Sequence, residues 1–175
     1  MSMALADCVR LAEFAHYHQY DKSGAPYIDH PKRVLGSVQA QGAQPHVQMA
    51  AVLHDITEDT PFTAQMLLDL GVPEAAVEIV KLVDRDISYD KFKEQNYGRD
   101  IGGKINGRYW YMALGPEGAD EFYYEQIKAN SGAVQVKLAD IGDNLRPWRL
   151  AYLPQETQGR LRKKYTKAIE LLTKD

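Results

Sequence analysis

The sequence lacks several features that would assign the protein to a specialised class. It has one cysteine, Cys8, so no internal disulfide can form, and the thiol is expected to be buried packing. The formal net charge is only −3, which gives no overall field to attract nucleic acid or an anionic membrane. No apolar run approaches the length of a membrane span. These absences argue against a membrane or nucleic-acid partner.

The amino terminus also lacks a basic region followed by an apolar core, so no signal peptide is expected. With a single cysteine, this predicts a reducing, cytoplasmic location. The chain has 175 residues and 45% hydrophobic content, which suits one globular domain with a proper core. We therefore expect residues 1–175 to form a single domain.

Apolar residues recur at helical spacing along most of the chain. Pro31 and Pro45 suit the first turn of a helix, and Thr63 is a candidate cap. The helix from Pro45 is expected to run through Leu53 into an acidic segment. The pattern predicts an all-α fold with helices near residues 3–18, 31–42, 45–59, 63–71, 73–83, 120–129, 131–146 and 155–174.

Residues 88–119 break this pattern. They are rich in glycine and aromatic residues, which predicts a Gly/Tyr-rich insertion forming a long loop or a small hairpin. The run Tyr109-Trp110-Tyr111 suits a lid that stacks on a base, a contact between subunits of a homo-oligomer, or a packed hairpin. The sequence does not choose between these alternatives.

The most informative segment is residues 54–59, which read His-Asp-Ile-Thr-Glu-Asp after an apolar run. On one continuous helix, His54 and Glu58 would be i,i+4 neighbours, as would Asp55 and Asp59. Burying four such groups costs several kcal/mol each unless a partner neutralises them. A divalent metal accepts imidazole and carboxylate ligands together and can activate a water for hydrolysis.

Further ligands must come from other helices, because one helix cannot enclose an ion. His30 stands at a predicted helix start, where its alternative role is simply to begin the helix. Asp140 stands in an otherwise apolar run, where its alternative role is to pair with a nearby Lys or Arg. Together with the acidic segment, these two residues predict a metal centre.

Three segments carry a resemblance to a known family. Residues 22–31 (KSGAPYIDHP), 54–60 (HDITEDT) and 137–146 (KLADIGDNLR) resemble KSGxPYxxHP, HDxxEDT and KLADxxxNxR. These are motifs of the RelA/SpoT alarmone hydrolase domains, which belong to the HD superfamily of metal-dependent phosphohydrolases. They occur in the family's order over nearly the whole chain, and its length is similar to that of the small stand-alone alarmone hydrolases.

The resemblance implies an HD-domain helical bundle with one Mn²⁺ ion. It also implies hydrolysis of a purine nucleotide, with release of the 3′-pyrophosphate from guanosine tetraphosphate (ppGpp) or pentaphosphate. By matching position, the implied metal ligands are His30, His54, Asp55 and Asp140.

The same resemblance assigns roles around the metal. Glu58 and Asp59 match the catalytic acidic pair, which orients and deprotonates the attacking water. Four further positions match family residues that surround the nucleotide and its phosphates: Lys22, Ser23, Asn144 and Arg146.

The substrate-reading positions depart from the family pattern. Asp21 stands where the family has an arginine that packs on the purine, and residues 141–143 read Ile-Gly-Asp instead of Arg-Leu-His. Two alternatives therefore stay open: hydrolysis of another nucleotide phosphate, such as the 2′-phosphate of NADPH or a deoxynucleotide, and a non-enzymatic, antitoxin-like binding module. The basic run at 160–167 favours a solvated helix face over an RNA-binding surface.

Overall fold

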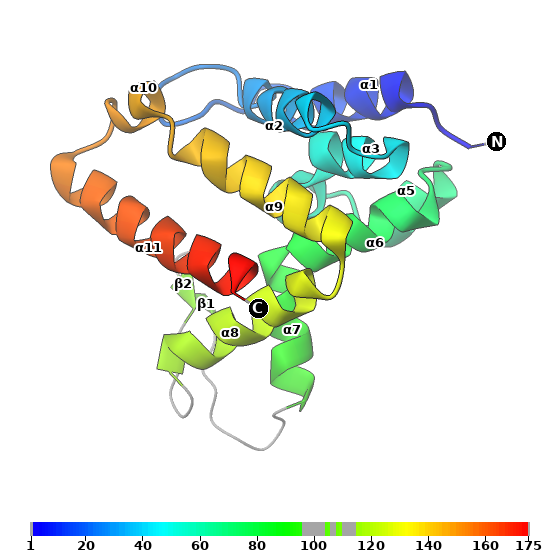
Figure 1. Cartoon of the computed structure of the whole chain (residues 1–175). Helices are drawn as coiled ribbons and strands as arrows, with labels where there is room; N and C mark the ends of the chain where they lie inside the picture. Colours follow the sequence, from blue (N-terminus) through cyan, green and yellow to red (C-terminus); the bar gives the residue numbers. More distant parts are fainter. Residues whose placement is uncertain (1, 96–103, 106–107, 110–114, 175) are drawn as a thin grey trace.

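Helices make up nearly all the regular structure of the protein. The computed structural model describes residues 2–95, 104–105, 108–109 and 115–174, and side chains at 104–105, 108–109 and 115–118 are not considered. The predicted all-α class is confirmed for this part of the chain (Figure 1). The elements are α1 (Leu5–Ala15), α2 (Asp29–Ala40), α3 (Pro45–Leu53), α4 (Ile56–Asp59), α5 (Ala64–Asp69), α6 (Glu74–Val83), α7 (Arg85–Gln95), β1 (Lys104–Ile105), β2 (Arg108–Tyr109), α8 (Gly115–Lys128), α9 (Ser131–Asn144), α10 (Pro147–Leu150) and α11 (Gln155–Thr173).

Local signals set several helix starts. Pro45 occupies the first turn of α3, where its missing N–H costs no hydrogen bond. The Thr63 hydroxyl accepts the Met66 N–H at the start of α5, and the Asn130 side chain accepts the Ala133 N–H at the start of α9. These are the boundaries that sequence reasoning located best.

The acidic segment does not form one continuous helix, so the i,i+4 premise was wrong. Helix α3 ends at Leu53, residues 54–55 form a turn, and α4 begins at Ile56. The His54 ring contributes to this ending, because its Nδ1 lies 2.9 Å from the Ala51 carbonyl oxygen one turn earlier. The break changes the directions of His54 and Asp55 relative to Glu58 and Asp59.

The predicted insertion is shorter than 88–119, because α7 extends to Gln95 and α8 already begins at Gly115. The two helices pack together through Phe92 and Phe122, whose ring centroids are 5.5 Å apart. The spacing of the buried residues Ser88, Tyr89 and Phe92 is helical, a signal that the glycine content of the stretch obscured. Between the helices, β1 and β2 form an antiparallel pair, as a small hairpin would; Trp110 and Tyr111 lie outside the described residues.

The core is centred on α3, which packs against α1, α2, α6 and α9. Its residues are apolar around most of the helix, as expected for a buried helix. Cys8 is fully buried beside this core, as predicted. Gly132 lets α9 approach closely, since a Cβ there would lie 2.7 Å from Ile79 Cδ1 and 2.9 Å from Val47 Cγ2.

Two further helices lie on the side of α9 that faces away from α2. Helices α8 and α11 contact each other and α9, so that α9 lies between α2 and α11 (Figure 1). Among the described helices, none is both long enough and apolar enough to span a membrane.

Candidate active site

A cavity of about 410 Å³ opens among α2, α4, α7, α8, α9, α10 and α11 and the loop before α2. Its lining combines acidic, basic and aromatic side chains. The residues that line it are Tyr20, Asp21, Lys22, Ser23, Tyr27, His30, Asp55, Glu58, Asp59, Arg85, Tyr124, Lys137, Asp140, Asn144, Arg149, Leu150, Leu153, Leu161, Lys164 and Tyr165.

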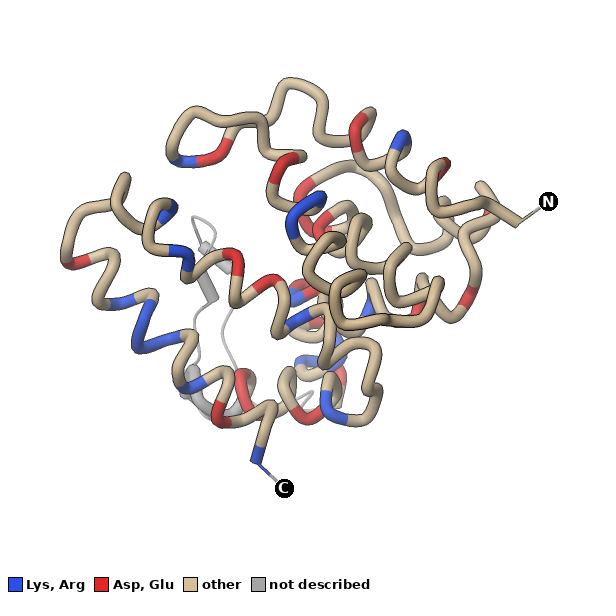
Figure 2. The backbone as a smooth tube through the Cα atoms, turned by 45° about the horizontal axis from the view of Figure 1, so that its top comes forward, with Lys and Arg blue, Asp and Glu red and all other residues tan. Residues whose placement is uncertain are grey.

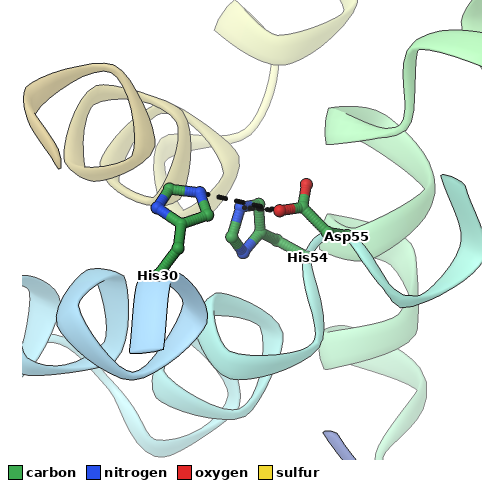
Figure 3. Close-up of side chains that lie close together, drawn as sticks. All are labelled: His30, His54 and Asp55. Carbon is green, nitrogen blue, oxygen red and sulfur yellow. Dashed lines mark ion pairs between the residues drawn. The ribbon is translucent and has the colours of Figure 1, made fainter. Parts of the chain in front are cut away.

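Three potential metal ligands converge beside this cavity. His30 projects from α2, and His54 and Asp55 project from the turn after α3, so that the three side chains meet (Figure 3). Each offers one ligand atom, and these atoms all lie within 4.8 Å of one another. The two imidazoles meet edge to face, with centroids 5.2 Å apart.

Asp140 brings a second carboxylate to the cluster from α9. Its Oδ1 lies 3.2 Å from His30 Nε2 and 3.9 Å from His54 Nε2. Burial raises the pKa of Asp140, but the charge of Lys137, whose Nζ lies 2.9 Å from Oδ2, opposes it, and that pKa lies well below its usual range. The carboxylate is therefore ionised. We call His30, His54, Asp55 and Asp140 the metal cluster.

The donor atoms of the metal cluster fit a divalent metal. His54 Nδ1 lies 2.9 Å from the Ala51 carbonyl, which can only accept, so the ring proton is on Nδ1 and Nε2 carries a lone pair. This Nε2 is buried, and among the described residues it has no hydrogen-bond partner. The nearby Asp55 Oδ2, at 3.0 Å, is itself an acceptor. A buried imidazole lone pair facing two carboxylates is an arrangement that a cation would neutralise.

The acidic pair, Glu58 and Asp59, lies next to the metal cluster on the cavity lining. Asp59 shares the Tyr27 hydroxyl with Asp55, at 2.9 and 2.7 Å, and Glu58 accepts the Arg85 backbone N–H at 3.2 Å. Burial raises the pKa of both acids, and the negative charge of Asp55 raises it further. Both carboxylates therefore take up a proton at a higher pH than an ordinary Glu or Asp side chain does.

Three of the four residues matched to the nucleotide lie on the cavity: Lys22, Ser23 and Asn144. The Ser23 hydroxyl donates to Asp21 at 2.6 Å, and Asp21 Oδ1 also accepts the backbone N–H groups of Ser23 and Ala25. Asp21 thus stabilises the backbone conformation of the loop before α2. Asn144 donates to Asp140 Oδ1 at 2.5 Å, so it orients a member of the metal cluster.

Arg146 is not brought to this cavity. Its Nε lies 2.9 Å from Asp143 Oδ1, and it lines a second hollow of about 370 Å³ with Arg33 and Ser37. Arg149, three residues later in α10, lines the main cavity instead. The sequence motif ends at residue 146, so it gave no signal for Arg149.

Sequence reasoning also missed most of the positive charge around the cavity. Five of the described Lys and Arg residues line it, and we call them the cationic lining: Lys22, Arg85, Lys137, Arg149 and Lys164. Lys164 was assigned to a solvated helix face, and Lys and Arg positions do recur along α11 (Figure 2). Lys164 is exposed, as that assignment implies, but desolvation at the cavity wall and the nearby charges of Arg85 and Lys137 lower the pKa of its ammonium group to about 8.

The helical fold and the cluster of His30, His54, Asp55 and Asp140 are those that the HD-domain resemblance implied. In sequence, the chain is a homologue of the (p)ppGpp hydrolase domain of the RelA/SpoT proteins. It is 34% identical over 147 residues, 84% of its length, to the guanosine-3′,5′-bis(diphosphate) 3′-pyrophosphohydrolase of Spiroplasma citri. It is 36% identical over 83 residues, 47% of its length, to the enzyme of the same name from Haemophilus influenzae.

The sequence matches cover a small part of each bacterial relative, whereas the structural match covers most of both chains. The chain spans only 17% and 12% of the lengths of the two bacterial proteins. A solved structure of a metazoan ortholog of SpoT, described as hydrolysing ppGpp and acting in starvation responses, shares the fold with a TM-score of 0.72. The match is 24% identical and covers 99% of this chain and 88% of that one. No family model matches the chain.

Proposed function

We propose that this protein is a metal-dependent hydrolase that removes the 3′-pyrophosphate from guanosine tetraphosphate or pentaphosphate. The observation that carries the proposal is the buried Nε2 of His54, which has no hydrogen-bond partner in the part of the chain that the structure describes and lies within the metal cluster, beside a cavity with a cationic lining. The names of the bacterial and metazoan relatives support the substrate.

The metal would be held by His30, His54, Asp55 and Asp140. The mixed imidazole and carboxylate ligands admit several divalent ions. Among these we propose Mn²⁺, because it is the ion that the family resemblance implies. When bound, it would polarise a phosphoryl oxygen and lower the pKa of a water.

The acidic pair would manage the proton of the attacking water. Glu58 and Asp59 lie beside Asp55, and their raised pKa values suit groups that accept a proton during turnover. The Tyr27 hydroxyl has one hydrogen for two carboxylates, so it links Asp55 to Asp59 and helps to fix both.

The cationic lining would bind the phosphate groups. Its side chains can form charge-assisted hydrogen bonds, which are roughly twice as strong as neutral ones. The cavity volume of about 410 Å³ lies in the usual range for small-ligand sites, about 300–1,000 Å³. A polyphosphorylated nucleotide therefore suits both the charge and the size.

Asp21 favours a second candidate, hydrolysis of another nucleotide phosphate such as the 2′-phosphate of NADPH. Its carboxylate is held in the loop by three hydrogen bonds, at a position where the family resemblance expects a purine-packing arginine. An Asp21→Arg variant would also remove these bonds, so a substrate panel tests the alternative more directly.

The test is to incubate the Mn²⁺-loaded protein with ppGpp, NADPH and the common ribo- and deoxynucleotides, and to follow the products by chromatography. Asp55→Ala is the matched control. Release of pyrophosphate from ppGpp, lost in the control, is the expected result. Release of phosphate from NADPH alone would transfer the function to that substrate, and no turnover by metal-bound protein would overturn the assignment.

A further inference from the structure

Asp143, near the end of α9, is a buried carboxylate for which the proposed chemistry has no role so far. Its residue is only 3% exposed. It lies behind His30, away from the main cavity, and lines the second hollow. A carboxylate this deeply buried requires ionic partners or strong hydrogen bonds.

Those partners are three guanidinium groups and one imidazole. Asp143 Oδ1 lies 2.7 Å from Arg33 Nε and 2.9 Å from Arg146 Nε, while Oδ2 contacts Arg149 and lies 2.7 Å from His30 Nδ1. Three guanidinium cations in contact with one carboxylate keep it ionised. The ionised carboxylate can only accept hydrogen bonds.

This contact determines which nitrogen of His30 carries the proton. Two groups approach Nδ1: Asp143 Oδ2 at 2.7 Å, which can only accept, and Arg149 Nη1 at 2.8 Å, which can only donate. Because Arg149 Nη1 already donates to the same carboxylate oxygen, we assign the Nδ1 hydrogen to the bond with Asp143. In the neutral ring, Nε2 then carries the lone pair. That atom lies 3.2 Å from Asp140 Oδ1 and 3.6 Å from Asp55 Oδ2.

We infer that Asp143 is a positioning residue, which holds His30 as the Nδ1–H tautomer with Nε2 toward the metal cluster and holds Arg149 on the cavity lining. The inference rests on the metal site of the proposed function and not on which nucleotide is cleaved. A carboxylate behind a metal-binding histidine fixes the ring and raises the basicity of the ligand nitrogen.

Asp143 also links α9 to α2 and α10 through its contacts. Its role in stability must therefore be separated from its role at the metal. His30 and Arg33 belong to α2, Asp143 to α9 and Arg149 to α10. Arg33 also lies over the Trp148 ring, 4.9 Å from its centroid. Loss of Asp143 is therefore expected to lower stability as well, and activity alone would not distinguish the two effects.

The first measurement needs no substitution at Asp143. In the ¹⁵N-histidine-labelled full chain loaded with diamagnetic Zn²⁺, long-range ¹H–¹⁵N NMR reports which ring nitrogens carry protons, and His30→Gln assigns the signal. We expect a proton on Nδ1 of His30 and a metal-bound Nε2. A proton on Nε2, with Nδ1 accepting from Arg149, would overturn the inference.

The second measurement is the dissociation constant for Mn²⁺ by titration calorimetry. Asp143→Asn is expected to weaken binding by about 10-fold or more, the low end of such effects, and Asp143→Glu to recover part of the loss. The matched control is Asp84→Asn, because Asp84 is a buried carboxylate that accepts from Thr57 and the Ile87 N–H. That control should lower the melting temperature and leave Mn²⁺ binding unchanged.

The outcomes separate this inference from the proposed function. Unchanged Mn²⁺ affinity in a folded Asp143→Asn variant would overturn the positioning role while the hydrolase proposal stands. A wild-type chain that binds metal as expected but cleaves no nucleotide would overturn only the hydrolase proposal. If Asp143→Asn does not fold, the tautomer of the wild-type chain decides, and a wild-type chain that binds no divalent metal overturns both.

Discussion

The metal cluster and the cationic lining share one cavity, but they are assembled from different kinds of sequence. The metal cluster comes from short motifs in α2, after α3 and in α9, and three of its four residues are buried. The cationic lining draws single residues from the loop before α2 and from α7, α9, α10 and α11, and only Lys22 and Lys137 among them lie in the quoted motifs.

The difference follows from what each part would do in the proposed function. Metal ligands must converge to within a few ångströms with defined donor atoms, which restricts both residue type and spacing. Phosphate charge can be balanced by Lys or Arg from many directions. Motifs therefore indicate the class of chemistry, whereas the dispersed cations and Asp21 are where substrate preference can change.

The largest effect should come from breaking the metal cluster itself. His54→Ala removes the buried nitrogen that has no hydrogen-bond partner among the described residues. Because metal catalysis contributes several kcal/mol, kcat/KM should fall by about 10³-fold or more. Steady-state kinetics and metal analysis of the purified variant check this, and full activity with no bound metal would contradict it.

Changing the acidic pair should separate proton transfer from metal binding. Glu58→Gln and Asp59→Asn should each lower kcat by about 100-fold or more, since general acid–base groups contribute on that scale. Calorimetry should show Mn²⁺ binding retained in both variants. If Mn²⁺ affinity fell in parallel with kcat, the two acids would have to be counted with the metal cluster.

Comparison of two arginines tests whether the cationic lining was identified correctly. Arg149→Ala should lower kcat/KM by about 10–100-fold, because a hydrogen bond between charged groups contributes about 1.5–3 kcal/mol. Arg146→Ala removes a half-exposed ion pair on the second hollow and should cost at most about fivefold. The reverse ranking would show that the motif position, and not the cavity, identifies the phosphate-binding arginine.

The cationic lining should also give a pH signature. The pKa of Lys164 is lowered to about 8, so its charge is lost as the pH rises through that value and anion binding weakens. We expect KM to rise above pH 8, by at most about tenfold between pH 8 and 9. The rise should be absent in Lys164→Met, and a KM profile shared by both proteins would contradict this assignment.

The smallest effect on catalysis should come from the core behind the metal cluster. A Cβ at Gly132 would meet Ile79 and Val47 at under 3.0 Å. Gly132→Ala should therefore destabilise the protein by about 1–3 kcal/mol through overpacking. Denaturant unfolding measures the loss, and kcat at a temperature where the variant is folded should stay unchanged.

Much of the fold could be predicted because its signals are local. Pro45, Thr63 and the apolar spacing located the start of α3 and the bounds of α5 and α6 to within a few residues. The break at residues 54–55 could not be predicted, because it depends on a side-chain contact between His54 and the Ala51 carbonyl. The helical part at 88–95 was missed because that sequence is mostly polar and the glycines from residue 98 onward dominate the stretch. Its apolar side chains gain meaning only where α7 packs against α8.

The sequence by itself determined the helical class and the candidate ligands of the metal cluster, because both depend on residue types at fixed spacings. Only the tertiary structure decided that Asp143 lies behind His30 and that Arg149, not Arg146, faces the cavity. These contacts join residues more than 100 positions apart, as His30 and Asp143 are, and no local pattern encodes such a distance. Packing of α2 against α9 brings them together.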